Sequence, residues 1–112
     1  MKRQTPESGV LKQVSDYLLA RRILHFRMQT GAHVASYRGR QRLIRYGTPG
    51  MADILAFTRK GPVWVEVKSA AGQQSPDQAG FEKIVTDEGH EYVLARSYLD
   101  VEARLRSMGA IR

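Results

Sequence analysis

Residues 61–69 of the chain are GPVWVEVKS, in which valines at every second position alternate with Trp64, Glu66 and Lys68. This is the period-two pattern of a β-strand with one buried face. The other face carries a carboxylate and an ammonium group two residues apart. The charged pair either lies on a sheet face open to water, as an ordinary cross-strand salt bridge, or belongs to a site that performs chemistry.

The length and composition of the chain limit its class. With 112 residues it has room for one hydrophobic core, so residues 1–112 are expected to form a single domain. It contains no cysteine, which excludes disulfides and cysteine-based zinc sites. No signal peptide and no apolar run approaching the ~18 residues of a membrane span are found. We expect a soluble, cytoplasmic protein with no membrane partner and no small-molecule substrate.

The distribution of charge indicates the kind of partner. The net charge is +7, and residues 1–74 hold 13 of the 18 basic residues but only four of the 11 acidic ones. Such a basic segment favours a polyanion, and its arginines suit bidentate contacts to phosphate. An acid kept within a basic segment is a candidate for binding a cation. The four acids are Glu7, Asp16, Asp53 and Glu66.

The first half of the chain is predicted to contain one helix, one strand and a long basic loop. Thr5 is expected to cap the helix, with Pro6 at its first position, and apolar residues keep helical spacing to about Arg22. A strand is expected at residues 23–29, closed by Thr30-Gly31. Residues 32–50, rich in arginine and glycine, are expected to form a loop with a short strand at 43–46.

The second half is predicted to contain three strands and two helices. The expected elements are strands at 52–58 and 63–69, a helix from 75–76 to about 88, a strand at 91–95 and a helix from 97 to 109. The segment RKGP, residues 59–62, joins the first two strands as a hairpin. Ser97 and Asp100 fit a variant of the capping box. The expected fold is therefore α/β, with a central mixed sheet flanked by helices.

The length of the hairpin turn determines which sheet face carries Asp53. An even length places Asp53 on the face of Glu66 and Lys68, whereas an odd length places it with the valines. In the even case the three side chains converge within reach of one ion, because neighbouring strands lie ~4.8 Å apart. Two carboxylates and a backbone carbonyl offer Mg²⁺ oxygen ligands, and the ammonium can stabilise charge developing on phosphate. These parts favour phosphodiester hydrolysis.

Three longer stretches resemble the PD-(D/E)XK nuclease superfamily, specifically its small VRR-NUC (virus-type replication-repair nuclease) domains. GTPGMADILAF at residues 47–57 looks like the first acidic motif, and VWVEVKSAAGQQSPDQAGF at 63–81 looks like the Glu-x-Lys strand and following helix. Residues 7–32 are similar to the opening helix and strand. The resemblance implies a restriction-endonuclease-like core and a DNA endonuclease that requires Mg²⁺ or Mn²⁺. Small stand-alone members further imply a homodimer that prefers branched DNA such as four-way (Holliday) junctions.

The resemblance also assigns roles to individual residues. The implied active-site residues are Asp53, Glu66, Lys68, Glu7 and Gln78. Asp53, Glu66 and the backbone carbonyl of Val67 are the implied metal ligands, and Glu7 helps to hold a second ion or a water. Lys68 is the implied catalytic lysine, and the glutamine lies beside its strand.

Five arginines are expected to contact DNA phosphates. They are Arg27, Arg38, Arg40, Arg42 and Arg45. Arg27 matches an arginine that follows a tryptophan in many relatives, where this chain has Phe26. The other four lie in the basic loop, which is either simply solvated or, because its glycines make it adaptable, able to follow a phosphate backbone or close over a distorted duplex. A spacing of two would give a charged row of arginines if this segment formed a strand. Trp64 shares the Glu66 face and could line the site, but we expect it to pack beneath the first helix. The three histidines show no metal-ligand spacing and are interpreted as structural.

Other interpretations stay open on the sequence alone. Asp53 also suits capping of the loop after Pro49-Gly50, and Glu7 suits the favourable field at a helix N-terminus. Gln78 also suits the surface of a helix start. The competing functions are a non-catalytic basic nucleic-acid-binding module and a nuclease that degrades DNA or RNA without preference for its structure.

Overall fold

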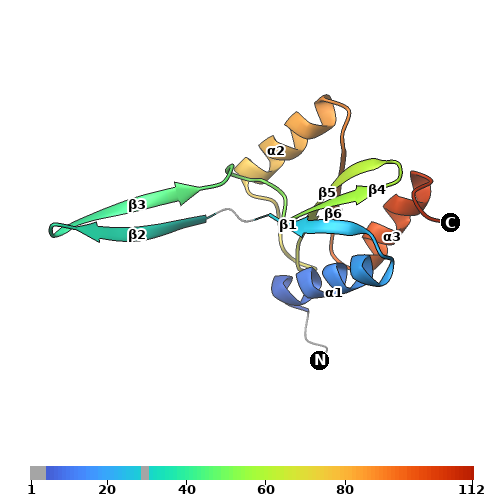
Figure 1. Cartoon of the computed structure of the whole chain (residues 1–112), viewed down its shortest axis with the longest axis horizontal. Helices are drawn as coiled ribbons and strands as arrows, with labels where there is room; N and C mark the ends of the chain where they lie inside the picture. Colours follow the sequence, from blue (N-terminus) through green and yellow to red (C-terminus); the bar gives the residue numbers. More distant parts are fainter. Residues whose placement is uncertain (1–4, 29–30) are drawn as a thin grey trace.

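The computed structural model describes residues 5–28 and 31–112, and for residues 31–35, 37 and 44–46 it describes the backbone alone. The helices are α1 (Glu7–Ala20), α2 (Pro76–Asp87) and α3 (Tyr98–Ser107). The strands are β1 (Leu24–Arg27), β2 (Gly31–Tyr37), β3 (Arg40–Tyr46), β4 (Ile54–Thr58), β5 (Gly61–Val67) and β6 (Glu91–Ala95). A four-stranded mixed sheet lies between α2 on one face and α1 with α3 on the other, and β2 and β3 extend away from it (Figure 1). The expected α/β fold with a mixed sheet between helices is confirmed.

The β4–β5 hairpin sets the register of the sheet, whose strand order is β1-β4-β5-β6. The two strands are joined by Arg59 and Lys60, so the turn has an even length, and Ile54 pairs with Val65. The Thr58 hydroxyl closes the turn, because its Oγ1 donates to the Gly61 carbonyl at 2.8 Å and accepts the Lys60 N–H at 3.0 Å. Strand β1 pairs antiparallel with β4, and β6 pairs parallel with β5.

The two faces of β5 meet different layers. Its valines join the main core, which α1 and α3 cover with residues such as Leu18 and Leu105. Trp64 lies on the opposite face and contacts Phe81 of α2, with ring centroids 5.1 Å apart. The expectation that Trp64 packs beneath the first helix is therefore wrong, because alternation along the strand turns it away from the valine face that α1 covers.

The ends of α1 and α3 differ from the sequence-based expectation. Pro6, not Thr5, is the N-cap of α1, since its backbone is extended and its carbonyl accepts the N–H groups of Gly9 and Val10. In α3, Ser97 caps the helix by accepting the Leu99 N–H at 3.2 Å. The Asp100 carboxylate accepts the N–H of Arg96, so the reciprocal bond of a capping box to Ser97 is replaced.

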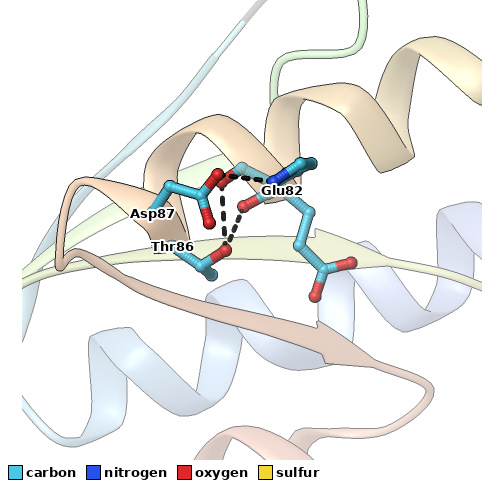
Figure 2. Close-up of polar contacts among 4 residues, drawn as sticks. Glu82, Thr86 and Asp87 are labelled. Atoms are coloured by element: carbon cyan, nitrogen blue, oxygen red, sulfur yellow. Dashed lines mark hydrogen bonds and ion pairs between the residues drawn. The ribbon is translucent and has the colours of Figure 1, made fainter.

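Helix α2 carries a complete capping box at its start and local side-chain bonds near its end. Ser75 Oγ accepts the Gln78 N–H at 3.2 Å, and Gln78 Oε1 accepts the Ser75 N–H at 2.8 Å. Near the other end, the Thr86 hydroxyl donates to the Glu82 carbonyl at 2.7 Å (Figure 2).

Among the described residues, no helix is long and apolar enough to cross a membrane.

The predicted basic loop is instead a β-hairpin. Strands β2 and β3 pair from Gly31 with Tyr46 to Tyr37 with Arg40. Arg38 and Gly39 form its turn with φ values of 50° and 75°, as a two-residue type I′ turn requires. The short strand expected at 43–46 lies within β3, but the prediction of a loop for the rest is wrong, because the arginines of β3 and the small residues of β2 obscure the apolar alternation that marks a strand. Gln29 and Thr30, at the end of the predicted strand before it, lie outside the described residues.

Gly50 connects the β2–β3 hairpin to the rest of the domain at a point with no room for a side chain. Its φ is +76°, and a Cβ there would lie 2.1 Å from the carbonyl oxygen of Asp77 in the first turn of α2. We expect Gly50→Ala to destabilise the fold by roughly 3 kcal/mol, from left-handed strain plus overpacking. Gly89→Ala is the matched control, because Gly89 has a φ of +84° and open space around it. Urea unfolding of both variants tests this, and equal losses would contradict the proposed contact.

Candidate functional site

Asp53 is fixed at the mouth of the β4–β5 hairpin by two backbone bonds. Continuing the β4–β5 register by one residue places it opposite Glu66. Its Oδ2 accepts the Val67 N–H at 2.8 Å, and its carbonyl accepts the Met28 N–H at 2.8 Å. The carboxylate thus takes the place of a main-chain acceptor just beyond the end of β4. Capping of the preceding loop does not account for this side chain, because its partner lies on the neighbouring strand.

Glu66 is fully buried, with 0% of its surface exposed. One carboxylate oxygen, Oε1, accepts a hydrogen bond from Gln78 Nε2 at 2.9 Å. The other, Oε2, is buried and has no hydrogen-bond partner among the described residues. Burial, together with the neighbouring Asp53 carboxylate, raises the pKa of Glu66 from 4.5 to about 9, although Lys68 acts in the opposite direction. A dry carboxylate oxygen without a donor is a position where a cation would be strongly stabilised.

The Glu7 carboxylate joins the other two from the opposite layer. It lies on the first turn of α1 and is exposed. One carboxylate oxygen from each of Glu7, Asp53 and Glu66 lies within 4.8 Å of the others. This all-oxygen set fits a hard divalent cation, and the unpartnered Glu66 oxygen supports that fit independently of the clustering.

Lys68 and Val67 complete the end of β5. Lys68 is 7% exposed, and its N–H donates to the Ala95 carbonyl at 3.0 Å, which extends the pairing with β6. The N–H of Val67 points toward Asp53, and the N–H and C=O of a strand residue point to the same side. The Val67 carbonyl is therefore directed to the Asp53 side of the strand, as its expected role as a ligand requires.

The side chain of Gln78 bonds to two residues, Ser75 and Glu66. The capping-box motif predicts only the first of these bonds. Its Oε1 completes the capping box of α2, while its Nε2 holds Glu66. The glutamine is thus a positioning residue that links the start of α2 to the buried carboxylate. The alternative that Gln78 is only a surface residue at the start of a helix is wrong, because its amide bonds to a buried side chain.

The expected DNA-contacting arginines are spread over two elements. Arg27 is exposed on β1 and pairs with Ile54, next to Asp53. Arg38, Arg40 and Arg42 are exposed on the β2–β3 hairpin, which extends away from the four-stranded sheet (Figure 1). The Arg45 backbone pairs with Ala32, and its side chain is outside the description.

Sequence reasoning missed the anchor of the loop that follows Lys68. The Arg96 guanidinium donates to the carbonyls of Ser69 at 2.6 Å and Gly72 at 2.7 Å. Arg96 lies 24 or more residues away, so no local pattern connects it to this loop. Of the histidines, His25 bonds through Nδ1 to the Ile23 carbonyl, which agrees with a structural role.

Comparison of the chain with protein-family models, with curated proteins and with solved structures finds no match in any of the three. Support for the site therefore comes from its geometry and from the resemblance of its motifs.

The raised pKa of Glu66 predicts how the stability of the metal-free protein changes with pH. At a pH between about 4.5 and about 9, Glu66 is ionised in the unfolded chain but protonated in the folded one, so folding takes up a proton. The free energy of unfolding should therefore fall as the pH rises through this range. Glu66→Gln keeps an acceptor for Gln78 without the charge, so it should stabilise the metal-free protein by roughly 2–4 kcal/mol at pH 8. Urea unfolding in EDTA at several pH values measures this.

The control for that experiment is Asp87→Asn, since Asp87 is exposed and pairs with Lys83 one turn earlier on the surface of α2. This variant should keep the pH dependence of the wild type. Identical pH slopes for the wild type and Glu66→Gln would show that Glu66 ionises normally in the folded protein.

Proposed function

We propose that this protein is a metal-dependent DNA endonuclease with a PD-(D/E)XK core of the VRR-NUC type. The observation that carries the proposal is the fully buried Glu66, which has one carboxylate oxygen without a partner among the described residues and lies in a cluster with the carboxylates of Asp53 and Glu7. Lys68 follows two residues later on the same strand face. Acid, acid and lysine in this order are what the motif resemblance implies for such a nuclease.

The residues of the site divide into ligands and a charge-stabilising group. Asp53, Glu66 and the Val67 carbonyl would hold Mg²⁺ or Mn²⁺, with Glu7 at the open side. When bound, such an ion supplies Lewis-acid activation of water and of the scissile phosphate. Lys68 adds a positive charge that is desolvated by burial, so it stabilises negative charge on a phosphate more strongly than an exposed lysine would.

The neighbours of the ligands keep them in place before the substrate arrives. The Val67 N–H fixes one oxygen of Asp53, and the Gln78 amide fixes one oxygen of Glu66. Each carboxylate keeps its second oxygen for a cation. Such preorganisation lowers the cost of binding an ion and orienting a phosphodiester.

The substrate part of the proposal is branched DNA, with the four-way junction first, bound by a homodimer. The basic first two-thirds of the chain and the exposed arginines of the β2–β3 hairpin support a nucleic-acid substrate. A hairpin that extends away from the four-stranded sheet suits contact with a second DNA arm (Figure 1). The motif resemblance supports the dimer.

The proposal is tested by incubating a labelled four-way junction, a matched duplex and a single strand with Mg²⁺, Mn²⁺ or EDTA. We expect metal-dependent cleavage, fastest on the junction, and a loss of at least ~100-fold in Lys68→Ala because the phosphate charge is no longer stabilised. Lys68→Ala should still be stabilised by Mg²⁺ in thermal unfolding, since the lysine is not a ligand, whereas Asp53→Asn should lose that stabilisation. Tight DNA binding without cleavage under either metal would refute the enzyme and leave a binding module.

The hairpin arginines generate a separate prediction on DNA binding. Arg40 and Arg42 are exposed on β3, so they should contribute to affinity through counterion release. Replacing both by glutamine should reduce the slope of log K against log salt concentration by about 2. Binding in EDTA at several salt concentrations measures the slope, with Lys83→Gln on α2 as the control. An unchanged slope would place the DNA elsewhere on the protein.

A further inference from the structure

A patch of large apolar side chains is exposed on the β1–β4 half of the sheet. It consists of Leu24, Phe26 and Phe57, which are 61%, 52% and 43% exposed. The two phenylalanine rings contact each other edge to face, with centroids 6.1 Å apart and an interplanar angle of 79°. Helix α2 covers the β5–β6 half of the same face through Phe81 and Val85, so it leaves this patch uncovered.

The patch is continuous with the carboxylate site. Leu24 pairs with Phe57, and Phe26 pairs with Leu55, while Met28 bonds to the backbone of Asp53. Asp53, Leu55 and Phe57 alternate along β4 and therefore share one face of the sheet. At ~3.4 Å per residue, the patch begins about 7 Å from Asp53 and extends to about 14 Å along the strand.

The charges around the patch favour a polyanion over a second copy of the chain. Residues 21–28 and 54–65, which contain β1, β4 and the part of β5 before Glu66, include five Lys or Arg and no Asp or Glu. Arg21 bonds to Glu102, while Arg22, Arg27, Arg59 and Lys60 are exposed. Two copies joined at this patch would bring like charges together, at an energetic cost. Aromatic faces among cations are instead the surface that binds single-stranded nucleic acid.

We propose that the Phe26–Phe57 patch is a stacking platform for unpaired bases of the DNA strand that enters the carboxylate site. The inference rests on the proposed nuclease function for the position of the cleaved bond. Bases inside a duplex have no free face for such stacking, so the platform takes nucleotides that are unpaired beside the cleaved bond, as they are where the branch point of a junction opens. Arg59, in the turn two residues after Phe57, would contact a phosphate of the stacked nucleotides.

The test is the binding of short oligonucleotides in EDTA, where metal-dependent cleavage does not interfere. The probes are a labelled single strand containing 2-aminopurine and a duplex of the same sequence. Phe26→Leu and Phe57→Leu keep apolar volume but remove the aromatic face, and Leu99→Ala on α3 is a control at a residue that is 56% exposed. Each phenylalanine variant should weaken single-strand binding by roughly five- to 100-fold and lose 2-aminopurine quenching, with duplex binding changed less than twofold.

Three results would overturn the inference. The first is single-strand binding and quenching that are equal in the phenylalanine variants and the wild type. The second is an equal loss of duplex and single-strand binding. The third is a change from dimer to monomer in sedimentation with single-strand binding intact, which would make the patch a self-association surface. Cleavage assays on the wild type and the same variants separate this from the nuclease proposal, because stacking by the wild type without any metal-dependent cleavage supports the platform and refutes the enzyme.

Discussion

The pairing of β4 with β5 through a two-residue turn is the constraint from which the site follows. One residue more or fewer between Thr58 and Gly61 would reverse the faces of one strand relative to the other. Asp53 would then point into the valine core, and the Val67 N–H would lose its carboxylate acceptor. The Thr58 hydroxyl, bonded to both ends of the turn, fixes this length locally. The Thr58 hydroxyl at one end of the hairpin therefore helps to determine which sheet face carries Asp53 at the other end, about five residues away.

The burial of Glu66 shows how the fold tolerates a costly group. A carboxylate without a partner in a dry site is destabilising unless it is protonated, hydrogen-bonded or matched by a cation. Gln78 satisfies one oxygen, and Lys68 offsets part of the charge. The remaining oxygen is left without a donor, so this end of the sheet is less stable than an apolar packing would be. Such a local deficit is characteristic of residues retained for function instead of stability.

The sequence predicted the elements of the core well because their signals are local. Alternation in β5, the capping box of Ser75 and Gln78, and the apolar strand β6 each depend on residues close in the chain. The β2–β3 hairpin could not be predicted in this way, since its strands lack apolar alternation and its Arg38-Gly39 turn resembles loop composition. The sequence also could not predict which helix covers Trp64. Periodicity shows that a strand has two faces, but it does not show which helix packs on each face.

For the site, the sequence could place Asp53 and Glu66 together only under one of two turn lengths. Gln78 as a Glu66 partner, and Arg96 as the anchor of the loop after Lys68, join segments far apart in the chain. Their hydrogen bonds depend on the packing of α2 and β6 against β5. Local patterns carry no information about these distances.

The close contact at Gly50 gives the projecting hairpin a mechanical connection to the site. Gly50 lies at the root of the hairpin and packs directly on the backbone of Asp77 and Gln78. Gln78 in turn holds the buried carboxylate of Glu66. The contact between Gly50 and the start of α2 is so close that even a methyl group does not fit at Gly50. The root of the hairpin, the first turn of α2 and the buried carboxylate are thus joined by two successive contacts, so a displacement of Gly50 toward α2 would also displace the backbone of Asp77 and Gln78.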